Sequence, residues 1–170
     1  GGDGDVRDVD VSYDGKKIIF AMKEDPDVPN GAYQDQPKWN IWEYNIEQKK
    51  LRKVIEWDIF SEEGDDVAPH YLPDGRILFS SSRQYGSKAL LLNEGKGMYK
   101  SLVDQENDHA MMLHVMDEDG TNIKQITYGL GRDMDPYVRS DGKIIFSRWD
   151  RYSGSDAINI YSVNPDGTQL

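Results

Sequence analysis

The chain has 170 residues and no cysteine, which excludes disulfides, thiolate nucleophiles, zinc–thiolate sites and covalent c-type haem attachment within this segment. Its formal net charge of −11 at pH 7 makes a nucleic-acid backbone or an anionic membrane face an unexpected partner. No run of apolar residues approaches the roughly 20 that a membrane-spanning helix needs. The sequence opens with GGDGD, which we expect to find in the middle of a longer protein.

The first predicted unit covers residues 6–57. It is expected to hold four strands, at residues 6–13, 16–23, 39–46 and 51–57. The Asp14-Gly15 turn is a strong hairpin signal, because Gly takes positive φ freely and Asp tolerates it. Residues 24–38 are dense in proline and are predicted to be a loop. Alternation in the first two strands predicts four inward side chains, Val9, Val11, Ile18 and Phe20.

The second predicted unit covers residues 65–127 and repeats the first around Asp74-Gly75. Its strands are expected at residues 67–71, 76–81, 111–117 and 122–127. An irregular insert, residues 82–110, separates the second strand from the third. A loop of this length inside a compact repeat is uncommon unless it covers a site or makes an interface.

The third predicted unit starts with a hairpin at residues 132–149 and continues with a strand at 160–164. Its fourth strand would only begin at Leu170, so it is expected to be truncated. The Asp-Gly dipeptides at 14, 74 and 141 are 60 and 67 residues apart. Four short antiparallel strands per repeat are typical of a β-propeller blade. The sequence therefore predicts an all-β fold, one partial β-propeller segment over residues 1–170 with about three blades, at about residues 6–57, 65–127 and 132–170.

Three segments carry a family resemblance. PHYLPDGRILFSSSR and DPYVRSDGKIIFSRWD resemble the TolB-type propeller repeat, and NIYSVNPDGT resembles its second half. More narrowly, the chain is similar to the propeller region of bacterial proteins related to the hydrazine synthase alpha subunit. The resemblance implies a propeller of about six or more blades in a secreted or periplasmic protein, where scaffold roles are more frequent than chemistry. A haem-dependent activity would need a Cys-x-x-Cys-His motif, which this segment lacks.

Acidic residues recur where the predicted blades begin. Because first strands line the channel of a propeller, Asp66, Asp133 and Asp135 are expected near one rim. Clustered carboxylates repel one another unless a cation or hydrogen-bond donors stabilise them, so a Ca²⁺ or Mg²⁺ site is one hypothesis. The alternative, which we favour, is that these aspartates accept backbone N–H groups in the turns between blades. No other cofactor is predicted.

A candidate ligand-binding set lies at the ends of the second strands. Arg83, Arg148 and Arg151 could grip an anion with their planar donor forks, or pair with neighbouring aspartates and tie blade to blade. Tyr85 and Asp150 lie beside them, and an exposed tyrosine could stack on a sugar or peptide.

The histidines and serines offer little catalytic chemistry. His70, His109 and His114 fall in an inner strand, a loop and a third strand, and His114 is expected to pack between sheets. No Gly-x-Ser-x-Gly elbow is present, so no catalytic residue is predicted.

Two classes of function stay open. One is a noncatalytic segment that binds a protein, a peptide or another ligand, and the other is part of a multidomain enzyme, an oxidoreductase or a hydrolase, whose catalytic residues lie outside the segment. Three blades are too few to close a propeller. The partners expected are therefore the remaining blades of a larger propeller, or a second copy in a homodimer that imitates a six-bladed ring.

Overall fold

The computed structural model describes residues 4–31, 35–56, 64–83, 110–129, 131–152 and 155–170. Among these residues, eleven strands form three antiparallel sheets. Sheet 1 contains β1 (Val6–Val11), β2 (Lys17–Met22), β3 (Asn40–Asn45) and β4 (Lys50–Lys53). Sheet 2 contains β5 (Asp66–Tyr71), β6 (Ile77–Ser81), β7 (Met112–Met116) and β8 (Lys124–Gln125). Sheet 3 contains β9 (Arg132–Val138), β10 (Ile144–Tyr152) and β11 (Ser155–Val163).

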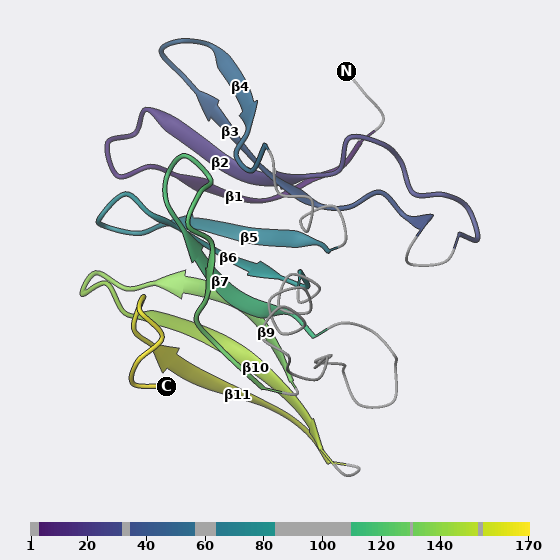
Figure 1. Cartoon of the computed structure of the whole chain (residues 1–170), viewed down its shortest axis with the longest axis vertical. Coiled ribbons are helices and arrows are strands. Elements are labelled where there is room, and N and C mark those ends of the chain that lie inside the picture. The colour runs from purple at the N-terminus through teal and green to yellow at the C-terminus, as the bar shows by residue number, and fades with distance from the viewer. Residues whose placement is uncertain (1–3, 32–34, 57–63, 84–109, 130, 153–154) are drawn as a thin grey trace, which may run out of the picture.

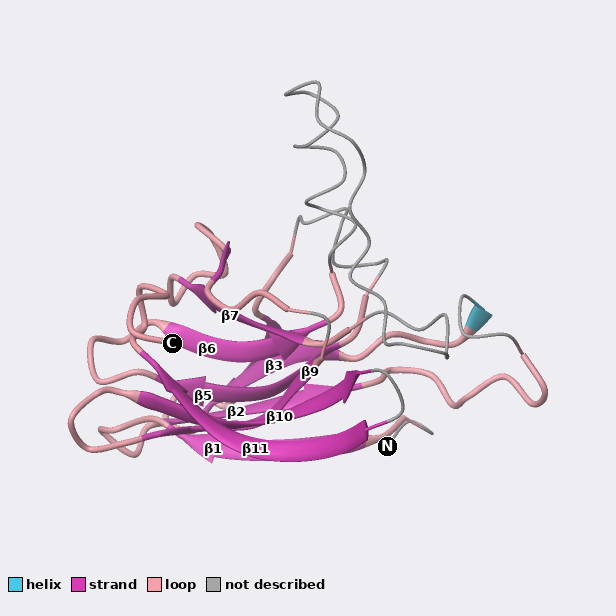
Figure 2. Ribbon diagram, turned by 90° about the horizontal axis from the view of Figure 1, so that it is seen from below, coloured by secondary structure: helices cyan, strands magenta, loops and turns pink. Residues whose placement is uncertain are grey.

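The three sheets follow one another in chain order, and their first strands β1, β5 and β9 lie side by side (Figure 1). The strands of each sheet are paired in up-and-down order. The Asp-Gly turns that join the first two strands of each sheet lie on one side of the sheets, and the segment that follows β2 extends on the opposite side (Figures 1 and 2). This is the arrangement of propeller blades, so the predicted all-β partial propeller is confirmed. Within the described part of the chain, no helix is long and apolar enough to cross a membrane.

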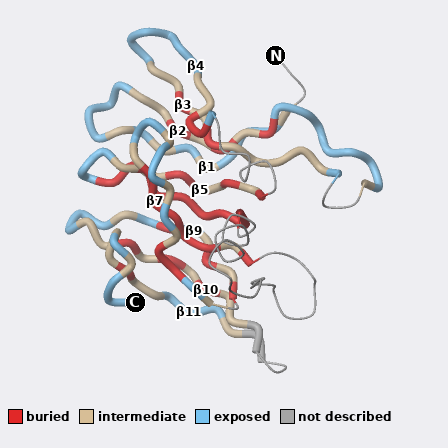
Figure 3. Tube along the Cα trace, in the orientation of Figure 1, coloured by how far each residue is buried: buried red, intermediate tan, exposed pale blue. Residues whose placement is uncertain are grey.

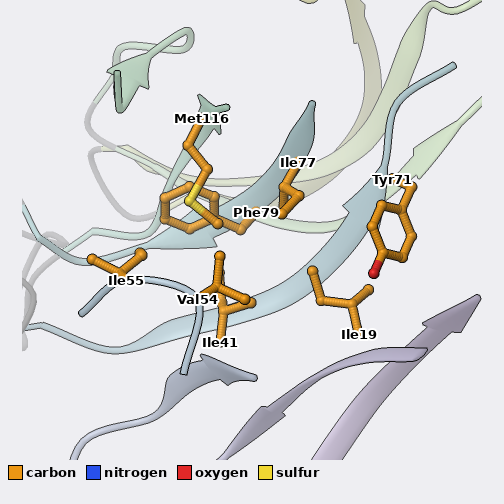
Figure 4. Close-up of a cluster of buried hydrophobic side chains, with 8 residues drawn as sticks. All are labelled: Ile19, Ile41, Val54, Ile55, Tyr71, Ile77, Phe79 and Met116. Carbon is orange, nitrogen blue, oxygen red and sulfur yellow. The ribbon is translucent and has the colours of Figure 1, made fainter. Parts of the chain in front are cut away.

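The hydrophobic core lies between the sheets. Sheets 1 and 2 enclose one cluster, in which the side chains of the two sheets face each other (Figure 4): Ile19, Ile41, Val54, Ile55, Tyr71, Ile77, Phe79 and Met116. Sheets 2 and 3 enclose another: Leu72, Leu78, Leu113, Val115, Ile126, Ile144, Phe146 and Val163. Every residue of β6 and β7 is buried, and Figure 3 shows that burial concentrates in this middle sheet. Sheet 2 therefore has both faces covered, as a blade inside a propeller does.

The inward positions predicted for the first hairpin are wrong. Val9 and Val11 are 61% and 51% exposed, and the buried residues of β2 are Ile19 and Ala21. Val11 pairs with Ile18, and this row lies on the face turned away from sheet 2, whereas Ile19 and Ala21 lie on the face toward it. The alternation of the strands was predicted, but not which of their two faces packs against the next sheet.

An irregularity recurs in the first strand of every sheet. Asp8, Ala68 and Asp135 have φ values of 55°, 50° and 49°, and each lies where the pairing of its strand shifts. Each also lies six residues before the Asp of an Asp-Gly turn. The three first strands thus contain the same β-bulge, a feature that bends a strand and re-aims its side chains.

A glycine precedes each of these strands, ten residues before the Asp of the turn: Gly4, Gly64 and Gly131. A Cβ atom at Gly64 would lie 2.7 Å from the backbone nitrogen of Arg83. At Gly131 it would lie 2.6 Å from the carbonyl oxygen of Trp149. The chain can enter the sheet this close to the second strand only because glycine has no side chain.

Strand lengths differ from expectation in the outer part of the sheets. Only Lys50–Lys53 and Lys124–Gln125 are paired as fourth strands. In sheet 3, β10 and β11 instead form a long hairpin, which pairs Ile144 with Val163 at one end and Tyr152 with Ser155 at the other. The strand predicted at residues 160–164 therefore starts five residues earlier, at Ser155.

Candidate functional site

The start of β5 holds a buried ion pair. Asp66 has no exposed surface, and the guanidinium of Arg83, itself 6% exposed, pairs with its carboxylate. The Ser81 hydroxyl donates to Asp66 Oδ1 at 2.5 Å. The guanidinium also lies over the ring of Phe79, 5.0 Å from its centroid. Two candidate residues from the sequence, Asp66 and Arg83, are thus bound to each other inside sheet 2.

Sheet 3 contains a second pair of the same kind. Arg148 Nε donates to Asp133 Oδ1 at 2.6 Å, and Arg148 Nη2 donates to Asp133 Oδ2 at 2.8 Å. The two residues are direct partners across β9 and β10, and the guanidinium lies over the ring of Phe146. These hydrogen bonds outweigh burial and raise the pKa of Arg148 above its usual value. The planar donor fork therefore serves to hold a carboxylate of the same sheet.

The link from sheet to sheet passes through the backbone of these aspartates. The Asp66 N–H donates to the carbonyl of Trp39 at 2.9 Å, and the Asp133 N–H donates to the carbonyl of Met111 at 2.8 Å. The Ser80 hydroxyl donates to the Asp133 carbonyl at 2.7 Å. Arg83 and Arg148 do pair with aspartates, but each pair lies within one sheet and does not tie one blade to the next.

Other aspartates accept backbone N–H groups across the gap between sheets 1 and 2. Asp8 Oδ2 accepts from the N–H of Ala68 at 3.0 Å, and Asp10 Oδ2 accepts from the N–H of Tyr71 at 3.1 Å. The imidazole of His70 lies 3.3 Å from Asp10 Oδ2. Burial raises the pKa of Asp10, but the bonds from His70 and Tyr71 outweigh it and leave the pKa below the usual value.

The three aspartates of the metal hypothesis are not brought together. Asp66 and Asp133 each bind an arginine in a separate sheet, and Asp135 is exposed at the bulge of β9. Among the residues that the structure describes, no group of three acidic or histidine side chains is placed to hold a metal ion.

Of the other members of the ligand-binding set, Asp150 lies near Arg148. Asp150 Oδ2 accepts from the Tyr161 hydroxyl at 3.3 Å, the Arg148 guanidinium lies 5.1 Å from the centroid of the Tyr161 ring, and the charge of Asp150 adds to the causes that raise the pKa of Arg148. Arg151 is opposite Asp156 in the register of β10 with β11, but its side chain lies outside the described part of the chain, as does Tyr85. Among the described side chains of the two sets, the structure therefore brings together the two Asp–Arg pairs and places Asp150 beside one of them.

Sequence reasoning missed a buried carboxylate, Glu43, in β3. Glu43 is 3% exposed and accepts from Arg52 Nε at 2.9 Å and from the Tyr71 hydroxyl at 2.8 Å, with Lys17 Nζ 3.7 Å away. Burial and the neighbouring Glu43 raise the pKa of Tyr71. Burial lowers the pKa of Lys17, but its bond with Glu118 outweighs this and raises the pKa overall. Glu43 thus holds residues of sheets 1 and 2 together.

Two surface hollows adjoin this cluster. One, of about 470 Å³, is lined by Arg52, Ile55, Glu56 and the turn at residues 119–123. The other, of about 200 Å³, lies between the Asp-Gly turns of sheets 1 and 2 and includes Lys17 and Tyr71. Both are formed where sheets 1 and 2 meet.

His114 lies in the core of the same region. Its ring stacks on Phe79 with the centroids 5.4 Å apart, and its Nδ1 lies 2.9 Å from the carbonyl oxygen of Met112. Burial and the positive charge of Arg83 lower the pKa of His114 to about 3. His114 is therefore neutral at pH 7 and packs in the core, as expected. His109 lies outside the described residues.

The blades, the inner bulges and the Asp–Arg pairs define a segment of a β-propeller. No known family model and no curated protein matches the sequence. Solved structures do match. Hydrazine synthase from Kuenenia stuttgartiensis superposes with a TM-score of 0.62 and 21% identity, over 96% of this chain and 24% of that protein. TolB from Acinetobacter baumannii superposes with a TM-score of 0.55 and 16% identity, over 96% of this chain and 30% of TolB.

A puromycin hydrolase also superposes, with a TM-score of 0.61 and 13% identity, over 98% of this chain and 21% of the hydrolase. The chain therefore has a TolB-like β-propeller fold, and it spans about a quarter of the length of these neighbours. At these identities the likeness shows the fold alone.

Proposed function

We propose that this chain is a noncatalytic β-propeller segment that serves as a protein-binding scaffold within a larger secreted or periplasmic protein. The location follows from the resemblance of its repeats to those of TolB-type proteins. The observation that carries the proposal is the uncovered outer face of sheet 3.

That face is apolar and accessible. Tyr137, Ile158 and Ile160 are 61%, 67% and 81% exposed. They share one face because they pair directly with Ile145, Trp149 and Ser147, which alternate along β10 and so point to the same side of the sheet. β11 also has a free edge, since no fourth strand pairs with it in the described structure. An exposed sheet edge beside an apolar face is a typical binding surface for another polypeptide.

The charged residues support a structural role as well. The guanidiniums of Arg83 and Arg148 and the carboxylates of Asp66 and Asp133 bind each other inside the sheets. Glu43 bonds residues of its own sheet and of sheet 2. These groups stabilise the blades and the contacts between them, which is what a scaffold requires.

Hydrogen–deuterium exchange on the chain alone and on the longer protein that contains it tests the proposal. The amides of β11 are expected to exchange more slowly in the longer protein, because a partner covers the edge and the face. Equal exchange rates in the two samples would show that nothing binds there and would sink the proposal.

A second measurement distinguishes the scaffold role from the alternative, in which the segment belongs to a multidomain enzyme. If the longer protein is an enzyme, His70→Gln and Asp150→Asn in this segment are expected to leave kcat and KM unchanged. A large fall in kcat in either variant would place catalysis in the segment and contradict the noncatalytic role.

A further inference from the structure

The first strands of the three sheets hold equivalent residues beside one another. β1, β5 and β9 lie side by side (Figure 1), and each contains a residue four positions before the Asp of its Asp-Gly turn. This residue, here called the inner position, comes two residues after the bulge and is in turn Asp10, His70 and Tyr137. Because first strands line the channel of a propeller, the inner positions lie along one wall of that channel.

The Asp10 carboxylate shows where an inner position points. Asp10 Oδ2 accepts from the N–H of Tyr71 at 3.1 Å, and His70 Nδ1 lies 3.3 Å from the same oxygen. The side chain of Asp10 thus reaches the first strand of the next sheet. The side chains of Asp10 and His70 are still 31% and 26% exposed, although another sheet follows each of them. A following sheet therefore leaves the inner position open to the channel.

Two exposed tyrosines belong to the same region. Tyr137 is the inner position of sheet 3 and is 61% exposed, and Tyr13, next to the Asp-Gly turn of sheet 1, is 66% exposed. The residue before the turn is exposed in sheet 2 as well, where it is Pro73, although sheet 1 packs on that sheet. Burial raises the pKa of Tyr13, and the nearby Asp10 and Tyr137 add to the increase. A carboxylate and two tyrosine rings thus share one part of the wall, although they come from sheets 1 and 3.

The charges along this wall favour a cation. The bulge residues Asp8 and Asp135 add two further carboxylates to the first strands. Two neighbouring basic side chains are held by carboxylates, since Arg7 pairs with Asp8 at 2.8 Å and Arg139 pairs with Asp141 at 2.9 Å. The formal net charge of −11 has the same sign as the wall. A positively charged ligand is therefore attracted to this surface and an anion is repelled.

We propose that Asp10, Tyr13 and Tyr137 form a binding site for an organic cation, an ammonium or guanidinium group, on the channel wall. Asp10 Oδ2 is taken by the N–H of Tyr71, so Oδ1 accepts from the cation, and the two tyrosine rings offer it their π faces. A lysine or arginine side chain of a polypeptide and a free amine both carry such a group. The site does not involve β11, so hydrogen exchange in β11 tests the proposed function and leaves this inference untouched.

Saturation-transfer NMR on the longer protein that contains this chain tests the proposal. The probes are a capped Gly-Lys-Gly tripeptide and n-butylammonium, and the control ligand is the same tripeptide with norleucine, which lacks the ammonium group. The lysine tripeptide is expected to bind saturably, and the norleucine tripeptide is not. If n-butylammonium binds too and competes with the lysine tripeptide, the site accepts a free amine; if it does not bind, the site requires a polypeptide.

Variants of the longer protein locate the binding. Tyr137→Leu removes one ring and is expected to weaken binding about two- to five-fold, which corresponds to about 0.5–1 kcal/mol. Asp10→Asn keeps an acceptor for the N–H of Tyr71 but removes the charge, and it should weaken binding at least as much. Tyr128→Leu is the matched control, because Tyr128 is 68% exposed just after β8 and lies outside the proposed site. Its affinity should equal that of the wild type.

Three results would each overturn the proposal. They are the absence of saturable binding by both cations, equal affinity for the lysine and norleucine tripeptides, and affinities of Tyr137→Leu and Asp10→Asn that match Tyr128→Leu. Circular dichroism with thermal melting shows whether each variant is folded. Because Tyr137 is exposed, Tyr137→Leu is expected to fold, and it tests the site even if Asp10→Asn is unstable.

Discussion

The buried pair between Arg148 and Asp133 gives a quantitative prediction about stability. Arg148→Met keeps a long unbranched side chain against Phe146 but removes both guanidinium hydrogen bonds from a carboxylate with no exposed surface. Removing one partner of a buried ion pair costs about 3–5 kcal/mol, because the remaining charge stays buried without compensation. We expect the free energy of unfolding to fall by about this amount, out of the roughly 5–15 kcal/mol that a typical domain has.

A surface pair in the same sheet is the matched control. The side chains of Arg139 and Asp141 approach to 2.9 Å and are 51% and 49% exposed. Exposed ion pairs contribute about 0.2–1 kcal/mol, because water screens the charges and ordering long side chains costs entropy. Arg139→Met is therefore expected to change the free energy of unfolding by less than about 1 kcal/mol.

Urea denaturation followed by circular dichroism measures both effects, at one low protein concentration because association would add apparent stability. Asp133→Asn combined with Arg148→Met removes both charges and keeps the backbone bonds of residue 133 to Met111 and Ser80. The double variant is expected to lose less than Arg148→Met alone. If Arg148→Met costs no more than Arg139→Met, the reasoning about buried charge is wrong.

Three further predictions concern the core, the strand entry and the acidic residues. Burial lowers the pKa of His114 to about 3, so below about pH 6.5 the unfolded chain binds a proton that the folded chain does not bind. The free energy of unfolding is therefore expected to decrease as the pH is lowered, by about 3 kcal/mol two pH units below this value. Urea titrations should show that His114→Phe removes this decrease. Gly131→Ala should lower the melting temperature, because its Cβ would meet the Trp149 carbonyl at 2.6 Å, whereas Gly129→Ala has ordinary contacts and should not. Calcium should leave the melting temperature unchanged, since the two buried aspartates already bind arginines; a calcium-dependent rise that Asp135→Asn abolishes would contradict this.

The fold could be predicted because its signals are local. Each Asp-Gly turn and its flanking apolar strands occupy fewer than about twenty contiguous residues, and the hairpin follows from turn geometry alone. The faces of the strands could not be predicted in the same way. Val9 and Val11 alternate with polar residues as an inward face would, yet both are exposed, because Asp10 between them faces sheet 2 and the two valines face away from it.

The candidate site was predicted as a set of residues but not as a set of bonds. Asp66 and Arg83 were both named, but Arg83 follows the end of β6 and the register partner of Asp66 is Ser81, so only the positions of the side chains show that the two residues bind each other. Glu43 was missed because a glutamate in a strand is expected to face solvent. Its spacing of two residues from Ile41 was the available signal, since alternate residues of a strand share a face.

The repeated bulge is a feature that the sequence of each strand alone does not predict. Ala68 has a φ of 50°, a conformation that is uncommon for alanine, so its own side chain cannot be the cause. The Asp8 carboxylate of the preceding sheet accepts the N–H of Ala68, and a bond of this kind can hold a backbone that the residue itself does not favour. Asp8 and Asp135 adopt the same conformation more readily, because aspartate tolerates it. The shape of β5 therefore depends on a carboxylate of sheet 1 as well as on its own residues, which makes the structure of one blade depend on the blade before it.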